Sequence, residues 1–230
     1  MKDIPASRRA PALFLLALLA AVAFGPPPAA AAGKVTIYGI RMEPYGDDAE
    51  DYSRPGWGGG ARLVAPVPST GGLFAGAFGA ELVNLLVETV RFQDPITMLR
   101  VEQQTNQNYG RVYLGGELGP HGRGFLRPYV AAHVAWVFYW IETDVVIPDD
   151  SSRENEIRQD LDSEWDDVFG YDLTVGMDWN FHRMWSIDTG VRFVKSFGVP
   201  QQLGDQSLEI HPQYFEVFLG VGIAIPQLGG

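Results

Sequence analysis

Arginines and carboxylates recur at alternate positions inside segments whose other residues are apolar or small. Such charges, once enclosed by protein, are tolerable only when they are paired with opposite charges. They could form a salt-bridge network that fills the interior of a fold, or they could line a narrow path for ions. We assign to this set Arg41, Arg62, Arg111, Arg127 and Arg192, with Glu81, Glu117, Asp172, Asp178, Asp188 and Glu216.

Histidine beside serine is the other pattern that could do chemistry. A nucleophilic serine needs a histidine base that is itself oriented by an acid. His133 lies among the alternating polar positions, where we expect it to be a hydrogen-bonding group of the interior. His121 and His182 (near Ser186) fall in predicted turns, and His211 lies near Ser207, without a recognisable motif. We therefore predict no catalytic residue and no enzyme, with a lipid A-modifying enzyme as the least favoured alternative.

An acidic segment, 143–167, is the third candidate. Asp160–Asp167 superficially resembles a calcium loop, but Trp165 stands where the loop needs glycine and Tyr171 where it needs glutamate, so an EF-hand is excluded. We expect a solvated acidic loop, with weak binding of divalent cations as the alternative. No metal-ligand set and no cofactor is predicted. The net charge of −11 argues against nucleic acid as a partner.

The segments that must position these side chains alternate with a period of two. In Phe169–Phe181 the odd positions are large and apolar, while the even positions are Gly, Asp, Thr and Asn. Such alternation is typical of a two-faced β-strand. The same reasoning predicts eight strands: Val35–Glu43, Trp57–Val67, Leu73–Leu86, Tyr109–Leu118, Leu126–Trp140, Phe169–Phe181, Trp185–Phe193 and Phe215–Ile225.

The connections between these strands alternate in length. Short ones lie at 68–72, 119–124 and 182–183, and long ones at about 44–55, 87–108, 142–167 and 198–211. Short turns at one end and long loops at the other indicate an up-and-down antiparallel arrangement. We predict an all-β fold, an eight-stranded up-and-down antiparallel transmembrane β-barrel. The apolar stretch Val83–Val87 could continue its strand or form a short helix.

Two observations place the apolar face outside. The polar face mixes glycine and alanine with charge, which suits the crowded lumen of eight strands. The apolar face carries aromatic residues near strand ends, as at membrane interfaces. A soluble barrel with its apolar face inward is the alternative. Because eight strands leave little room for a channel, we favour a plugging charge network over an ion path. The aromatic residues are Trp57, Trp140, Trp179, Phe181, Trp185 and Phe215.

Three sequence stretches resemble a known family. Leu126–Val134 is similar to a strand of OmpA/OmpW-type outer-membrane β-barrels, as is the Gly-x-Gly pattern of Leu219–Gly222. Phe218–Ile225 resembles the final strand that the barrel-assembly machinery reads, although Ile225 replaces the usual aromatic residue. The resemblance covers 34–226. It implies an integral outer-membrane protein, surrounded by membrane lipid and lipopolysaccharide, with a structural or interaction role or a conduit for small hydrophobic molecules.

The first 32 residues have the pattern of a secretory signal. Lys2, Arg8 and Arg9 precede an uncharged apolar run, Pro11–Phe24, and Ala30–Ala32 offers small residues for cleavage. We expect residues 1–32 to be removed and 33–230 to form the barrel domain. The protein is then expected in the outer membrane of a diderm bacterium.

Overall fold

The computed structural model describes residues 33–50, 53–93, 100–121, 124–147, 157–182, 184–203 and 206–225. Residues 32–226 form one compact unit. The expected signal segment lies outside the described residues. Within the described part of the chain, no helix is long and apolar enough to span a membrane.

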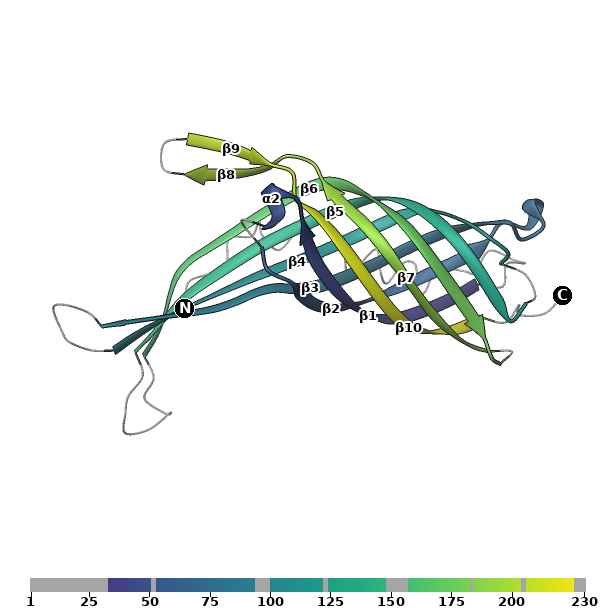
Figure 1. The fold of residues 1–230 in the computed structure, drawn as a ribbon, viewed down its shortest axis with the longest axis horizontal. Coiled ribbons are helices and arrows are strands. Elements are labelled where there is room, and N and C mark those ends of the chain that lie inside the picture. The colour runs from purple at the N-terminus through teal and green to yellow at the C-terminus, as the bar shows by residue number, and fades with distance from the viewer. Residues whose placement is uncertain are drawn as a thin grey trace, which may run out of the picture. The chain divides into compact units, whose positions relative to one another are not determined.

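Eight antiparallel strands close into a barrel in the order β1-β10-β7-β6-β5-β4-β3-β2 (Figure 1). Closure is made by β1, which pairs with β2 on one side and with β10 on the other. The fold class predicted from alternation is therefore confirmed. The strands are β1 (Gly33–Tyr45), β2 (Gly56–Pro66), β3 (Phe74–Gln93), β4 (Arg100–Leu118), β5 (Leu126–Ile147), β6 (Ile157–Asn180), β7 (Trp185–Ser196) and β10 (Gln213–Ile225).

Short turns join the strands at one end of the barrel, as predicted. The first contains a 3-10 turn, η2 (Pro68–Thr70), closed by Gly71 in a left-handed conformation (φ 64°) that favours glycine. The start of β1 and the end of β10 lie at this same end, since Gly33 pairs with Ile225. We call it the short-turn end.

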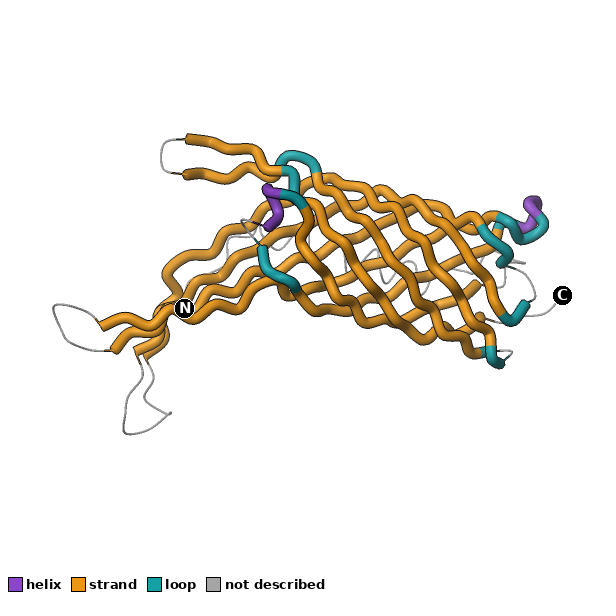
Figure 2. The backbone as a smooth tube through the Cα atoms, in the orientation of Figure 1, coloured by secondary structure: helices purple, strands orange, loops and turns teal. Residues whose placement is uncertain are grey.

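At the opposite end, the predicted bounds of two long loops, 87–108 and 142–167, are wrong. Strands β3 and β4 stay paired out to Gln93 and Arg100, and β5 and β6 out to Ile147 and Ile157. The stretch Val83–Val87 is therefore strand, and Asp160–Asp167 lies in β6. These long pairs form a four-stranded projection beyond the barrel wall, here called the arm (86–93, 100–107, 141–147 and 157–164), visible in Figure 2.

The error has a physical cause. Alternation reports a strand only when its two faces meet different surroundings. The β4 part of the arm is polar at every position of Gln103–Gln107, so it has no apolar face to reveal the strand. Its backbone groups nevertheless pair across the hairpin. The segment 198–211 likewise contains a hairpin, β8 (Val199–Leu203) with β9 (Gln206–Ile210), and 44–55 contains the short helix α2 (Asp47–Glu50).

The two faces of the wall separate as predicted. Val175, Val134 and Leu219 are 65%, 67% and 62% exposed on the outside. The charged residues that the sequence assigned to the lumen lie inside the barrel. Arg41 is the exception, because it follows the odd-numbered outward positions of β1. There its side chain pairs with Glu43 at 2.7 Å and lies 4.9 Å over the Trp57 ring. Our assignment of Arg41 to the lumen is therefore wrong.

Candidate functional site: the charged lumen

The lumen is filled by side chains that fall into three tiers along its length. At the short-turn end, Arg62 of β2 pairs with Glu117 of β4 at 2.9 Å and with Asp188 of β7. Tyr129 connects the same groups, since its hydroxyl accepts a hydrogen bond from Arg62 (2.9 Å) and donates one to Asp188 (2.8 Å). The first tier thus connects strands that are not adjacent in the barrel.

Lys34 completes this tier. Its ammonium group lies 3.0 Å from Asp178 and 3.3 Å from Asp188. Arg127 also pairs with Asp178, at the edge of the barrel. The short-turn tier therefore balances three cations against three carboxylates, Glu117, Asp178 and Asp188.

The middle tier is built around two fully buried arginines. The Nη1 atom of Arg192, on β7, lies 2.8 Å from a carboxylate oxygen of Glu81 on β3 and 2.8 Å from one of Glu216 on β10. Arg111 of β4 reaches Asp172 of β6 at 2.9 Å and Glu216 at 3.3 Å, and its Nε also pairs with Glu81. In the closed order of eight strands, β7 stands opposite β3, and β4 opposite β10. The Arg192–Glu81 and Arg111–Glu216 ion pairs therefore cross the full width of the lumen.

His133 belongs to the middle tier. Its Nδ1 lies 2.7 Å from Asp172, whose other oxygen contacts Arg111, and its ring packs 4.9 Å from Tyr113. Tyr38 adds a further link by donating to Glu81 (3.1 Å). His133 is thus a hydrogen-bonded interior residue, as the sequence predicted.

Tyrosines form the third tier, toward the arm. The ring of Tyr109 packs 5.4 Å from Tyr139 and 5.7 Å from Tyr214. The hydroxyl of Tyr139 bonds to Ser196 at 2.8 Å, and that of Tyr214 to Ser53 at 3.1 Å. Fully buried apolar side chains complete the filling of this part of the lumen, namely Ile40, Met42, Ala49, Val83, Leu85, Val137 and Val194.

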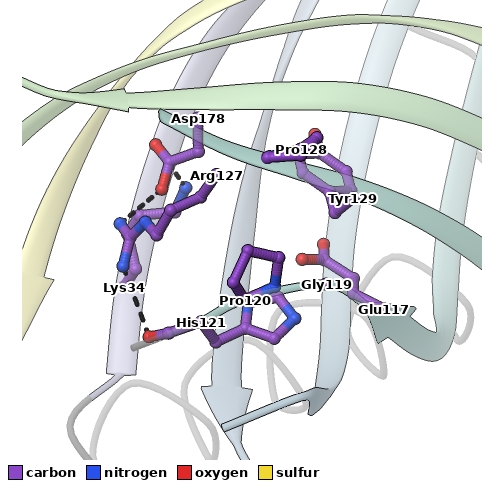
Figure 3. A pocket seen from close by; sticks show the side chains of 9 residues that line it. All are labelled: Lys34, Glu117, Gly119, Pro120, His121, Arg127, Pro128, Tyr129 and Asp178. Carbon is purple, nitrogen blue, oxygen red and sulfur yellow. Dashed lines mark hydrogen bonds and ion pairs between the residues drawn. The ribbon is translucent and has the colours of Figure 1, made fainter. Parts of the chain in front are cut away.

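A small pocket opens at the short-turn end (Figure 3). Its cavity of about 10 Å³ has room for roughly one water molecule. Arg127 closes one side by donating to the backbone oxygen of His121 (3.3 Å). Partial burial lowers the pKa of His121, because desolvation disfavours the imidazolium form. The lining residues are Lys34, Glu117, Gly119, Pro120, His121, Arg127, Pro128, Tyr129 and Asp178.

The remaining histidines take part in backbone contacts. His182 Nδ1 accepts a hydrogen bond from the amide of Met184 (3.3 Å), and His211 Nδ1 accepts one from the amide of Gly198 (3.0 Å). Ser186 is buried inside the barrel, whereas His182 is exposed on the neighbouring turn. The residues that the structure describes hold no group of three or more side chains placed to bind a metal ion.

The structure brings together ten of the eleven charged residues that the sequence assigned to the lumen, with Arg41 outside. Sequence reasoning missed Lys34 and two of the third-tier tyrosines, Tyr109 and Tyr214. Lys34 shares the even-numbered positions of β1 with Thr36 and Tyr38, which point inward. The even-numbered face of β1 is largely apolar, so the alternation in the sequence did not show that this face points into the lumen.

The chain matches no protein-family model and no curated protein sequence. Solved structures do resemble it. Neisserial surface protein A (NspA) is 9% identical, with a TM-score of 0.50 over 83% of this chain and 96% of that one. A major outer membrane protein from Thermus thermophilus is 11% identical, with a TM-score of 0.54 over 84% of this chain and 100% of that one. At such identities the likeness concerns the fold, which is that of the eight-stranded outer-membrane β-barrel.

Proposed function

We propose that this chain is an integral outer-membrane protein with a closed lumen, which acts structurally and through the surfaces it presents outside the bilayer. Residues 1–32 would direct export, and the barrel-assembly machinery would insert 33–230. The short turns would face the periplasm, and the arm would face the exterior.

One observation carries the closed lumen. Arg192 reaches Glu81, and Arg111 reaches Glu216, from opposite walls of the barrel. Tyr109 and Tyr214 meet across the same width one tier further along. Groups that touch across the diameter leave no space between them for a solute. An eight-stranded barrel is also just wide enough to be filled by side chains.

Planar-bilayer recording tests this proposal. The wild-type protein is expected to insert without conductance steps. The double variant Glu81→Ala/Arg192→Ala shortens both ends of one crossing and is expected to raise conductance, if only in brief openings. The matched control Arg91→Ala/Glu102→Ala removes an ion pair of the arm (2.7 Å) and should stay silent. Reproducible wild-type steps that disappear in Asp172→Asn would favour the narrow pore.

The exterior would carry an acidic rim. Glu50 and Glu142 are exposed toward the arm end, and Asp167 is exposed on β6. Such a rim attracts divalent cations or basic partners modestly and in a salt-dependent way. Binding of Ca²⁺ to the folded protein, measured by calorimetry at low and at physiological salt, tests this. Absence of binding at low salt would remove divalent cations from the proposed partners.

A further inference from the structure

An aromatic surface covers the outer face of β5 and β6 where the arm leaves the barrel. The register places Trp136 opposite Phe169, Phe138 opposite Asp167, and Trp140 opposite Trp165. All six lie at outward positions of their strands. We call this set the aromatic ladder.

The rings of the ladder pack on one another. Trp140 and Trp165 stack with their centroids 5.6 Å apart and their planes 20° from parallel, and Trp136 and Phe169 stack at 6.4 Å and 19°. Phe138 lies between them, 5.1 Å from Trp136 and 5.7 Å from Trp165. Trp165 and Phe169 are 45% and 70% exposed, Trp136 and Trp140 are partly exposed, and Phe138 is buried beneath its neighbours. Mutual packing fixes these rings, so the exposed ones present an aromatic face at little cost in side-chain entropy.

Of the aromatic residues that the sequence assigned to the membrane interface, Phe215 marks the level of this aromatic belt at the arm end. The ladder begins at that level and continues beyond it, so that Trp140 lies above the interface to which the sequence assigned it. Phe215 pairs with Phe193, whose partner Leu173 pairs with Ala132 of β5. Residues that pair across successive strands do not stay at one height along the barrel axis. The succession of pairs that starts at Arg41 of β1 and passes through β10, β7, β6, β5 and β4 ends at Phe74 of β3, close to the short-turn end. For tilted strands the paired residue drops by about one residue per strand. Ala132 is three strands away from Phe215, so the residue of β5 at the same height as Phe215 lies a few positions nearer the arm, near Trp136.

Trp140 and Trp165 therefore stand above the belt. They lie four residues along their strands from Trp136 and Phe169, which is ~10 Å along the barrel axis for a rise of ~3.3 Å per residue and a tilt of ~40°. That distance carries them past the hydrocarbon boundary.

Two carboxylates on the same outer face indicate that the ladder meets water and not hydrocarbon. Asp167 lies among the rings, accepts a hydrogen bond from Trp136 Nε1 (2.8 Å) and is exposed. Glu142 is exposed next to Trp140 on the same face. A carboxylate facing hydrocarbon is destabilising, whereas one above the interface is not. The ladder thus combines flat apolar rings with acceptors that remain hydrated.

We propose that the aromatic ladder docks the sugar rings of the outer leaflet's own glycolipid, that is, the core sugars of lipopolysaccharide. The apolar C–H face of a sugar ring packs on an aromatic ring, and its hydroxyls donate to Asp167 and Glu142. The ladder continues the lipid-facing surface of the barrel beyond the interface. A glycolipid whose acyl chains contact that surface therefore has its sugars at the height of the ladder. This inference rests on the proposed membrane location.

Fluorine NMR of 5-fluorotryptophan-labelled protein in nanodiscs tests the contact. The chain has six tryptophans, and Trp179 and Trp185, on the outer face at the short-turn end, serve as internal controls. The resonances of Trp140 and Trp165 are expected to shift when core-bearing lipopolysaccharide is added to phospholipid. They should not shift with lipid A that lacks core sugars, and those of Trp179 and Trp185 should be the same in both.

A matched pair of variants gives a second measurement. Trp140→Leu/Trp165→Leu should weaken retention of core-bearing lipopolysaccharide by the detergent-solubilised protein at least tenfold. Trp179→Leu/Trp185→Leu, which removes the same two residue types elsewhere, should not. Equal effects of the two pairs, or unmoved Trp140 and Trp165 signals, would overturn the proposal, leaving the ladder to a protein partner. An equal shift with lipid A would overturn it in favour of contact below the sugars.

Failure of the membrane location is distinguishable from failure of the sugar contact. Bromine-labelled acyl chains should quench Trp179 and Trp185 if the barrel spans the bilayer. Without that quenching the proposed function fails. With quenching but no response to core sugars, only the sugar contact fails.

Discussion

At the scale of single residues, the charged lumen is a set of mutually dependent groups. Arg192 contacts Glu81, Glu216 and Thr174 and has 1% of its surface exposed. Each carboxylate in turn contacts a second arginine or a tyrosine. Because a buried charge is costly without its partner, losing one group exposes the others to that penalty.

Arg192→Met should therefore destabilise the barrel by about 3–5 kcal/mol, since it leaves two buried carboxylates under-compensated. Urea titration of folding into lipid vesicles, followed by tryptophan fluorescence, measures the free energy of unfolding. The control Arg91→Met breaks an ion pair whose arginine side chain is 61% exposed, and is expected to cost about 0–1 kcal/mol. Similar losses for the two variants would contradict a lumen held by paired charges.

At the scale of elements, glycines let neighbouring strands coil closely around a narrow interior. A Cβ added to Gly115 of β4 would meet the backbone of β5, with the Cα of His133 at 2.6 Å and the carbonyl oxygen of Ala132 nearer still. A Cβ on Gly76 of β3, at an outward position, would meet nothing within 4 Å. Gly115 is thus fixed by close approach of two strands.

Gly115→Ala is expected to destabilise the barrel by about 1–3 kcal/mol, because two strands must separate to admit the methyl group. Gly76→Ala is the matched control and should change stability little. The same vesicle titration compares them. If Gly115→Ala is as stable as Gly76→Ala, the close packing of β4 on β5 is wrong.

In the part of the chain that the structure describes, the strands of the arm pair with one another: β3 with β4, β4 with β5 from Glu102 to Gln107, and β5 with β6. Beyond Leu86 the described part of β3 pairs with β4, and the ion pair Arg91–Glu102 (2.7 Å) lies within that hairpin. Replacing 88–105 by a two-residue Asn-Gly turn should leave the barrel folded. The retained gel shift between unboiled and boiled samples would show this, and loss of that shift would mean that the arm supports the wall.

At the scale of the whole molecule, the outer surface is apolar over the height of the barrel. In water such a surface would associate, whereas in a bilayer it is solvated by lipid. The unboiled protein from an outer-membrane fraction is therefore expected to resist dodecyl sulfate and to migrate differently from the boiled protein. A periplasmic protein without that shift would contradict the membrane location.

Val175→Arg probes the same surface at one position. Val175 is 65% exposed and pairs with Val130 and Val191 in mid-wall. Arginine there should cost about 2–4 kcal/mol of folding free energy in a bilayer. The control Val90→Arg, on the arm and 49% exposed, should cost little. If the outer face of this barrel met water, both changes would be equally mild, so vesicle titration of the two variants tests the membrane location.

The sequence by itself determined the barrel, its strand order and the direction of most of its side chains. Alternation of large apolar residues with Gly, Asp and Arg exists only where the two faces of a strand meet different surroundings. The order followed from the alternating lengths of the connections. Ten of the lumenal charges could therefore be predicted without coordinates.

The tertiary structure alone decided which charges meet, where the strands end and which residues share a surface. Arg111 and Glu216 are 105 positions apart in the chain, and only the closed register brings them together. The β4 part of the arm, Gln103–Gln107, is polar at every position and therefore carries no alternation to mark its strand. Arg41 points outward because its neighbours in β1 set its direction. The aromatic ladder likewise depends on the register between β5 and β6, since pairing across strands is a long-range property that local periodicity does not encode.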